Sequence, residues 1–219
     1  LETYPRTPDA DAKILEEHGC DFLYLPEVSD VYPDGEAVSA TTDLDFGSLT
    51  ERMEGANRPG HFDGVAQVVS RLLDIVRPTK LVMGQKDYQQ VAVIRSMLAQ
   101  LALPTDLIVV PTVREADGLA MSSRNRRLEA ADREAAGTIN RHLAAVAAGI
   151  LAGWAPRQLE GLALDAMSAN PRLRPEYVEV CDGETLLPYH PESSVQEVVV
   201  AAAVWCGPVR LIDNQVIRM

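Results

Sequence analysis

The sequence predicts an α/β fold, in which a parallel sheet flanked by helices is followed by a smaller α+β domain. Short apolar runs alternate with amphipathic helical segments up to about residue 112, a spacing typical of parallel, doubly wound sheets. After residue 125 the order changes to alanine-rich helices and then consecutive strand-like segments. The composition agrees, because 47% hydrophobic and 24% charged residues are ordinary for a globular chain of 219 residues. We therefore predict two domains, residues 1–112 and 113–219.

The first half of the chain shows helix and strand signals in turn. Asp9 is a candidate cap for the first helix and Gly19 a candidate stop. The expected elements are a helix over 9–18, a short buried strand over 21–25, a turn over 31–35, helical turns over 49–53, a polar loop over 55–62, a helix over 64–76, a buried strand over 80–83, a helix over 91–101 and a strand over 107–110. Ligands in such sheets bind beyond the carboxyl ends of the strands, so the segments after residues 83 and 110 are the first places to search.

The second half predicts helices and an antiparallel sheet. Helices are expected over 128–151 and 156–169, and strands over 177–180, 195–204 and 209–212. Asp182-Gly183 and Gly207-Pro208 are turn signals beside these strands. The boundary between the two domains is expected near 111–113.

Charge and cysteine content narrow the class of protein. A net charge of -12 argues against broad contact with nucleic acid, which needs a basic face. No apolar run approaches the roughly 20 residues of a membrane span, so no membrane partner is expected. Cys20, Cys181 and Cys206 are far apart and odd in number, which favours free thiols. The expected location is cytoplasmic.

The segment Gly84–Gln90 has the chemistry of an anion-binding turn. A glycine at a strand end lets a ligand approach the backbone closely. Lys86 and Asp87 stand where the next helix begins, and the amides and dipole there favour an anion. Gln89 and Gln90 add neutral donors and acceptors suited to a carboxylate or hydroxyl. The alternative is a solvated turn that carries a charged pair.

The segment Arg114–Asn125 is a long polar loop between a strand and a helix. Ser122, Ser123 and Arg124 offer two hydroxyls, backbone amides and a guanidinium to a phosphate chain. Gly118 would let the loop move as a lid. The alternative is a linker in which a serine only caps the next helix.

His61 stands in a polar loop and is a possible contact for a phosphate or sugar, or else a structural residue. The other histidines are scattered and show no metal-ligand spacing, so no protein metal site is expected. No Ser-His-Asp arrangement, Walker loop or Gly-x-Gly-x-x-Gly string is visible. These absences argue against P-loop and classical dinucleotide chemistry.

Six strings, in order and at matching separations, resemble the pantothenate synthetase (pantoate–β-alanine ligase) family along essentially the whole chain. They are Tyr4-Pro5-Arg6, Glu54-Gly55 with 58–62, Gly84–Gln90, 111–115 with 117–120, Met121–Asn125 and Arg210–Asn214. Any one of these strings is short enough to arise by chance. Six together in this order are specific.

The resemblance implies a Rossmann-like domain of the HIGH-type nucleotidyltransferase superfamily, followed by a small lid-like domain, in a homodimer. It implies a ligase that uses ATP and Mg²⁺ to join pantoate to β-alanine. The carboxylate of pantoate would attack the α-phosphate of ATP, giving pantoyl adenylate and pyrophosphate. The amine of β-alanine would then displace AMP, giving pantothenate for coenzyme A biosynthesis.

The resemblance also implies roles for individual residues. Lys86 and Arg124 are the expected catalytic residues, and Gln90 is expected to hold pantoate. The expected ATP-binding residues are Gly84, Lys86, Asp87, Val113, Met121, Ser122, Ser123 and Arg124. Among them, Lys86 and 122–124 would contact phosphate, Asp87 the ribose, and the backbones of Gly84, Val113 and Met121 the nucleotide. His61 would lie near the site, and no acidic cluster identifies ligands for Mg²⁺.

The sequence departs from the family at its beginning. Family members open with a strand and a histidine-containing loop of the HIGH type. The sequence as printed begins at Leu1 and contains no counterpart of this opening segment. That segment would carry two catalytic histidines and a second glutamine that holds pantoate. For a chain that starts at Leu1, the expectation is no detectable adenylation. The alternatives are therefore a fragment that folds or binds nucleotide without turnover, or another HIGH-type nucleotidyltransferase.

Overall fold

The computed structural model of the chain describes residues 7–33, 35 and 43–219, and the division between its two compact units falls at residues 40 and 41. In the first unit, α1 (Pro8–Glu17) confirms the predicted helix, with Thr7 rather than Asp9 at the cap position. Gly19 ends it as predicted, with φ +75° and its amide 3.0 Å from Glu16 O. The short helix α2 (Val28–Val31) follows. The family string at 4–6 lies outside the described residues.

The predicted strand over 21–25 is wrong. These residues have no regular secondary structure, and Phe22 and Leu25 are 92% and 71% exposed. A strand requires a partner for its backbone hydrogen bonds, and the described part of this unit contains no other strand. The predicted turn is supported by the Gly35 amide, which donates to Tyr32 O at 3.1 Å, while Asp34 lies outside the described residues.

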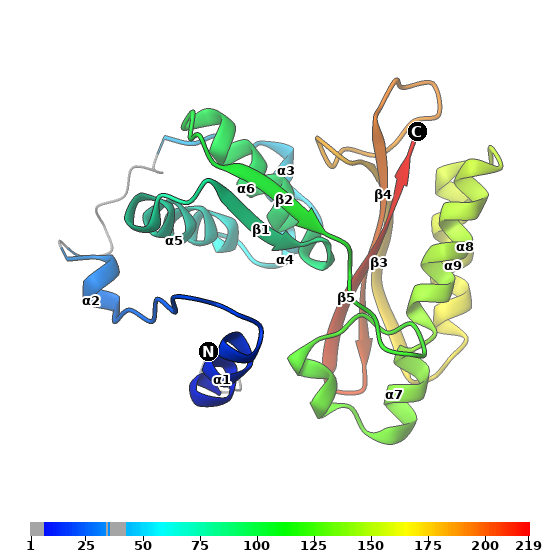
Figure 1. Ribbon diagram of the computed structural model, residues 1–219. Helices are drawn as coiled ribbons and strands as arrows, with labels where there is room; N and C mark the ends of the chain where they lie inside the picture. Colours follow the sequence, from blue (N-terminus) through cyan, green and yellow to red (C-terminus); the bar gives the residue numbers. More distant parts are fainter. Residues whose placement is uncertain (1–6, 34, 36–42) are drawn as a thin grey trace. The chain divides into compact units, whose positions relative to one another are not determined.

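The second unit begins with helices and a parallel sheet, as predicted (Figure 1). The elements are α3 (Ser48–Glu51), α4 (Met53–Asn57), α5 (His61–Val76), β1 (Lys80–Gly84), α6 (Tyr88–Gln100) and β2 (Asp106–Val110). The strands β1 and β2 pair in parallel, with Gly84 opposite Val110 at their carboxyl ends. The buried face of α6 is formed by side chains such as Val91, Ile94 and Met97, all fully buried.

The burial of β1 differs from the buried strand predicted over 80–83, and β2, for which only a strand was predicted, has the same alternating burial. Leu81, Met83 and Leu107 pack against the core of α5 and α6. On the other face, Val82 is 60% exposed, Ile108 38% and Val110 40%. Side chains alternate across a strand, so the apolar run supplies one covered and one open face among the described residues.

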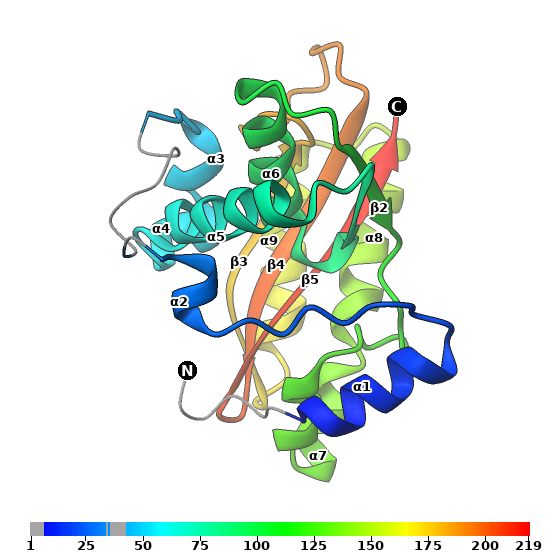
Figure 2. The same ribbon diagram turned by 60° about the vertical axis from the view of Figure 1, so that its left-hand side comes forward.

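The rest of the second unit is an antiparallel sheet covered by helices. Its elements are α7 (Ala130–Ala136), α8 (Ile139–Leu151), α9 (Pro156–Ser168), β3 (Leu173–Asp182), β4 (Glu197–Cys206) and β5 (Val209–Arg218). The sheet order is β3-β4-β5, all antiparallel, as predicted. The expected single helix over 128–151 is two helices, separated at Gly137 and Thr138. Figure 2 shows α8 and α9 behind this sheet and α6 on its other side.

The central strand β4 connects the two cores of this unit. Val198, Val200 and Val204 pack into the core formed with α8 and α9, whereas Val199 packs into the core formed with α5 and α6. Both cores therefore share one sheet. None of the helices in the described ranges is long and apolar enough to span a membrane.

Candidate active site

The two loops selected from the sequence leave the sheet at the same edge. Because β1 and β2 are parallel, Gly84 and Val110 end together, and the segments 85–87 and 111–127 both start there. Short 3-10 turns form in each loop, at Gln85–Asp87 and Ser123–Arg127. Both turns also contact β5. The parallel connection thus places next to each other two segments that are separate in the sequence.

The first loop presents a cation with little neutralisation. The Lys86 side chain is 19% exposed, and its Nζ lies 4.0 Å from a carboxylate oxygen of Asp87, whose side chain is 54% exposed. Gly84 is exposed, and a Cβ built on it would meet no atom within 4 Å. The described residues therefore leave open space at Gly84, as close approach of a ligand would require.

The two glutamines in the first turn of α6 have different surroundings. Gln89 is 7% exposed, donates to Leu49 O at 2.7 Å and Arg52 O at 3.0 Å, and accepts from the Glu54 amide at 3.0 Å. Its side chain is thus fully used in holding the segment that carries α3 and α4. Gln90 is half-buried and lines the cleft described below. Of the pair, Gln90 is the one available to a ligand.

The second loop is built around a serine cap. Ser122 Oγ accepts from the Arg124 amide at 3.3 Å, as the capping alternative predicted, and Asn125 Nδ2 donates to Ala120 O at 3.0 Å. Ser122 and Arg124 also line a small hollow together with Lys86. The cap and the contact with the hollow coexist, because the hydroxyl that accepts one hydrogen bond can still donate another.

A larger cleft gathers predicted residues from both loops and from α5. It has a volume of about 580 Å³, and four predicted residues line it, His61, Asp87, Gln90 and Arg124. Lys86 shares one hollow with His61, Asp87 and Gln90, and another with Ser122 and Arg124. The predicted side chains therefore converge on one region of the second unit.

The remaining predicted residues are placed differently. Met121, 54% exposed, and Ser123 line a neighbouring hollow together with Ser122. Gly84 and Val113, 61% exposed, line none of these hollows. A contact through their backbones, which is what the resemblance implies, stays a prediction.

An ion pair that lines the same cleft had no role in the sequence-based prediction. Glu54, 9% exposed, accepts two hydrogen bonds of 2.7 Å from the guanidinium of Arg210 and one of 3.0 Å from the Tyr177 hydroxyl. Arg210 also donates to Glu176 at 2.7 Å. Burial raises the pKa of Glu54, but the hydrogen bonds and charge of Arg210 outweigh it, and the net pKa lies below its usual range.

No local pattern could have found this pair, because Glu54 and Arg210 are 156 residues apart. The only signal was indirect: both residues lie inside strings that resemble the family. Three further arginines at the cleft, Arg58, Arg124 and Arg127, make no ion pair with another described residue. In a chain of net charge -12, this local excess of positive charge favours an anionic ligand.

His61 begins α5 and is half-buried beside the cleft. Burial lowers its pKa, and the nearby charge of Arg58 lowers it further, while Glu54 and Asp87 act in the opposite direction. The imidazole is therefore mostly neutral at pH 7, so it acts there as a hydrogen-bonding group rather than as another cation.

The described residues contain no group of three or more His, Cys, Asp and Glu side chains placed to hold a metal ion. Mg²⁺ commonly keeps several waters and binds through substrate phosphates with one or two carboxylates. The cleft has Asp87 among its lining residues, which fits that mode of binding.

Comparisons with known proteins agree on one family. A family model described as pantoate-beta-alanine ligase matches residues 1–216. A pantothenate synthetase of Porphyromonas gingivalis is 44% identical over 214 residues, which cover 98% of this chain and 74% of the relative. One from Corynebacterium glutamicum is 45% identical, with 96% of this chain and 74% of the relative covered.

Solved structures give the same result. Pantothenate synthetase from Thermus thermophilus matches with a TM-score of 0.88 at 39% identity, covering 97% of this chain and 75% of that one. A pantoate-beta-alanine ligase from Francisella tularensis, in complex with beta-gamma ATP and beta-alanine, matches with a TM-score of 0.72 at 30% identity, covering 98% of this chain and 71% of that one. The α/β fold and the site's position on it, together with these matches, show that the chain belongs to the pantoate-beta-alanine ligase family.

Proposed function

We propose that this chain carries the ligase activity of its family, the ATP-dependent condensation of pantoate with β-alanine to pantothenate, with release of AMP and pyrophosphate. The observation that carries the proposal is the convergence of Lys86, Gln90 and Arg124 with His61 around one region. The carboxylate of pantoate and the polyphosphate of ATP are both anions. The cleft arginines that form no ion pair with another described residue, Arg58, Arg124 and Arg127, provide positive charge for both.

In the first step, a carboxylate oxygen of pantoate attacks the α-phosphorus of ATP. A new O–P bond forms, the bond to the β-phosphate breaks, and pyrophosphate leaves with the bonding electrons. Negative charge spreads over the phosphate oxygens, so the main requirements are positioning and neutralisation. Lys86 and Arg124 supply cations, Ser122 and Ser123 supply donors, and Gln90 orients pantoate.

The adenosine part of ATP lies along the two loops. We assign Asp87 to the ribose hydroxyls, and the backbones of Gly84, Val113 and Met121 to the rest of the nucleotide. These four residues are exposed, but the Met121 amide already donates to Val113 O at 2.9 Å, so the nucleotide would contact the other backbone groups of these two residues. Mg²⁺ bound together with ATP would lower the phosphate charge that Lys86 and Arg124 must balance, and no side chain of the chain is assigned to it as a ligand.

In the second step, the amine of β-alanine attacks the carbonyl carbon of pantoyl adenylate. The C–N bond of pantothenate forms, the C–O bond to AMP breaks, and the amine loses a proton to solvent. The amine of β-alanine is protonated in solution near pH 7 and must be neutral when it attacks. A neutral His61 at the cleft adds no positive charge that would repel the protonated amine as β-alanine binds.

Pantoate-dependent exchange of pyrophosphate into ATP tests the first step. K86A should lower the exchange rate about 100-fold, because removing a donor to developing phosphate charge costs roughly 3 kcal/mol. It should also weaken ATP binding. Lys80 lies at the opposite end of β1 and is exposed, so K80A is the matched control and should leave exchange unchanged.

Three outcomes are distinct. Exchange that requires pantoate, followed by pantothenate formation with β-alanine, supports the proposal. Nucleotide binding without exchange would instead support the non-catalytic alternative. Unchanged ATP binding in K86A would refute the assignment of Lys86.

The proposal has three further parts, of which the homodimer follows from the family resemblance, the domain boundary from the change in the sequence pattern, and the location from the cysteine content. The domain boundary lies at residues 112 and 113, with 1–112 binding nucleotide and pantoate and 113–219 forming the lid-like part. The active form is a homodimer, and its location is the cytoplasm, where Cys20, Cys181 and Cys206, all free, would stay reduced. Light scattering across a concentration series measures the mass in solution, and a monomer at every concentration would refute the dimer.

A further inference from the structure

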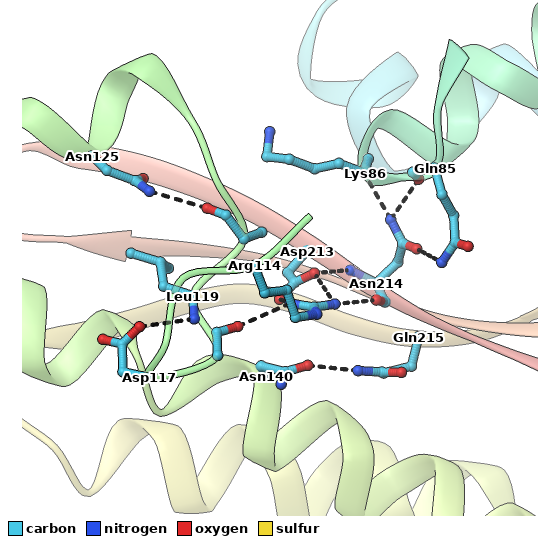
Figure 3. A network of polar contacts seen from close by, with 12 residues as sticks. Gln85, Lys86, Arg114, Asp117, Leu119, Asn125, Asn140, Asp213, Asn214 and Gln215 are labelled. Atoms are coloured by element: carbon cyan, nitrogen blue, oxygen red, sulfur yellow. Dashed lines mark hydrogen bonds and ion pairs between the residues drawn. The ribbon is translucent and has the colours of Figure 1, made fainter. Parts of the chain in front are cut away.

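Two adjacent residues of the edge strand β5 contact both phosphate-binding loops (Figure 3). Asp213 and Asn214 are 6% and 2% exposed, which is unusual for such polar side chains. Asn214 Nδ2 donates to Gln85 O at 3.1 Å and to Lys86 O at 2.8 Å, and its Oδ1 accepts from Gln85 Nε2 at 3.1 Å. One side chain thus holds two consecutive peptide carbonyls of the loop that carries Lys86.

The chemistry of these contacts requires an amide. Backbone carbonyls only accept hydrogen bonds, so the group facing Gln85 O and Lys86 O must be a double donor. The group facing Gln85 Nε2 must be an acceptor. Asparagine satisfies both needs with one planar group, whereas aspartate would point an acceptor at two acceptors and leucine would leave all three partners unsatisfied.

The neighbouring residue does the same for the second loop. The Asp213 carboxylate accepts two hydrogen bonds from the Arg114 guanidinium, at 2.7 and 3.0 Å, and one from the backbone N–H of Asn214, at 2.7 Å. Arg114 also donates to Gly118 O at 3.1 Å and Asn214 O at 3.2 Å. The guanidinium therefore fixes both ends of a tight loop that leads into residues 122–124.

We propose that Asp213 and Asn214 are positioning residues that hold the 84–87 loop and the 113–125 loop in register, so that Lys86 and Arg124 grip the same phosphate chain. The inference rests on the proposed function, since it assumes that both loops bind ATP. Lys86, Ser122, Arg124 and Asp213 line one hollow, so a shift of either loop would separate the groups that line it.

The test compares N214D with N214L in pantothenate formation at pH 8 and pH 6. At pH 8, N214D should lower kcat about 30- to 100-fold, because misplacing reacting groups by about 1 Å costs on that order. The KM for pantoate should stay within about 3-fold, because Asn214 does not hold Gln90. Each rate is taken relative to the wild-type chain at the same pH.

The pH dependence separates positioning from a general loss of structure. A carboxylate that faces two carbonyls in a buried site favours its protonated form, which can donate one hydrogen bond. N214D should therefore regain most of its activity at pH 6, to within about 5-fold of wild type, whereas N214L should stay impaired at both values. Equal defects of N214D at the two pH values, or wild-type kcat in N214D at pH 8, would overturn the proposal.

N170D is the matched control, since Asn170 lies in the turn between α9 and β3, where its Oδ1 accepts from the Arg172 amide at 3.1 Å, and the kcat of N170D should equal that of wild type. Hydrogen exchange gives a readout that does not need turnover. N214D should speed exchange of the amides at 85–88, and R114K that of Glu115, Leu119 and Met121, whose amides are bonded within the loop or near its ends. Unchanged hydrogen exchange in both variants refutes the positioning role of Asp213 and Asn214. Faster hydrogen exchange in a chain that shows no pantoate-dependent turnover refutes only the proposed function.

Discussion

Arg210 offers an internal test of how burial sets the strength of an ion pair. Its guanidinium bonds Glu54 and Glu176, whose side chains are 11% and 28% exposed. Replacing each carboxylate by the isosteric amide, in E54Q and E176Q, removes one charge while volume is kept. The same arginine serves as partner in both variants. Each carboxylate also accepts one hydrogen bond from an aromatic side chain, from Tyr177 at Glu54 and from Trp205 at Glu176. The two sites therefore differ in burial and in the number of hydrogen bonds that Arg210 donates to them.

The expected magnitudes differ because the two sites are solvated differently. Glu54 accepts two bonds from Arg210 and one from Tyr177, and a hydrogen bond to a charged group contributes about 1.5–3 kcal/mol. The amide keeps one acceptor oxygen, and Arg210 keeps Glu176, so the full cost of about 3–5 kcal/mol for breaking a buried pair is not reached. We expect E54Q to lower the free energy of unfolding by about 2–4 kcal/mol, and E176Q by about 0.5–1 kcal/mol.

Urea denaturation followed by circular dichroism measures both values, with a fall in melting temperature of roughly 6–12 °C for E54Q as a second readout. The pKa of Glu54 is lowered in the folded state, so its stabilisation is present above the unfolded pKa and lost as pH falls through the folded pKa. The difference between wild type and E54Q should therefore shrink in acid. A loss in E176Q equal to that in E54Q would refute the reasoning, as would a difference that does not change in acid.

Two further predictions concern α4 and α5. A Cβ on Gly55 would lie 2.0 Å from the backbone oxygen of Thr50, so G55A should destabilise the chain by at least about 3 kcal/mol. Gly64 has open space around it in an exposed helical position, so G64A should stabilise the chain by about 0.5–1 kcal/mol. Chemical denaturation measures both free energies of unfolding, and equal effects of the two substitutions would contradict the steric account. The pKa of His61 is lowered in the folded state, mainly by burial and further by the charge of Arg58. As the pH falls from 7 to 5, the unfolded chain therefore takes up a proton on His61 more readily than the folded chain, and the stability of wild type relative to H61Q should fall. A difference in stability that stays constant with pH would show that the imidazole is not desolvated.

Much of the fold and part of the site could be predicted from the sequence, because these depend on local pattern. The apolar periodicity located α5, α6, β1 and β2 to within a few residues. The parallel connection then implied that Gly84 and the loop after Val110 share one edge of the sheet, which the register confirms. The strand expected over 21–25 failed because an apolar run cannot specify its partner.

The sequence by itself determined the element types, the two candidate loops and the family. Only the tertiary structure decided which side chains meet: the Glu54–Arg210 pair across 156 residues, Gln89 used inside the fold while Gln90 faces the cleft, and Asn214 bound to the backbone of Lys86. The physical reason is range. Periodicity and capping act within a few residues of the chain, whereas burial and electrostatic pairing depend on distances in space that the packing of β5 against both loops creates.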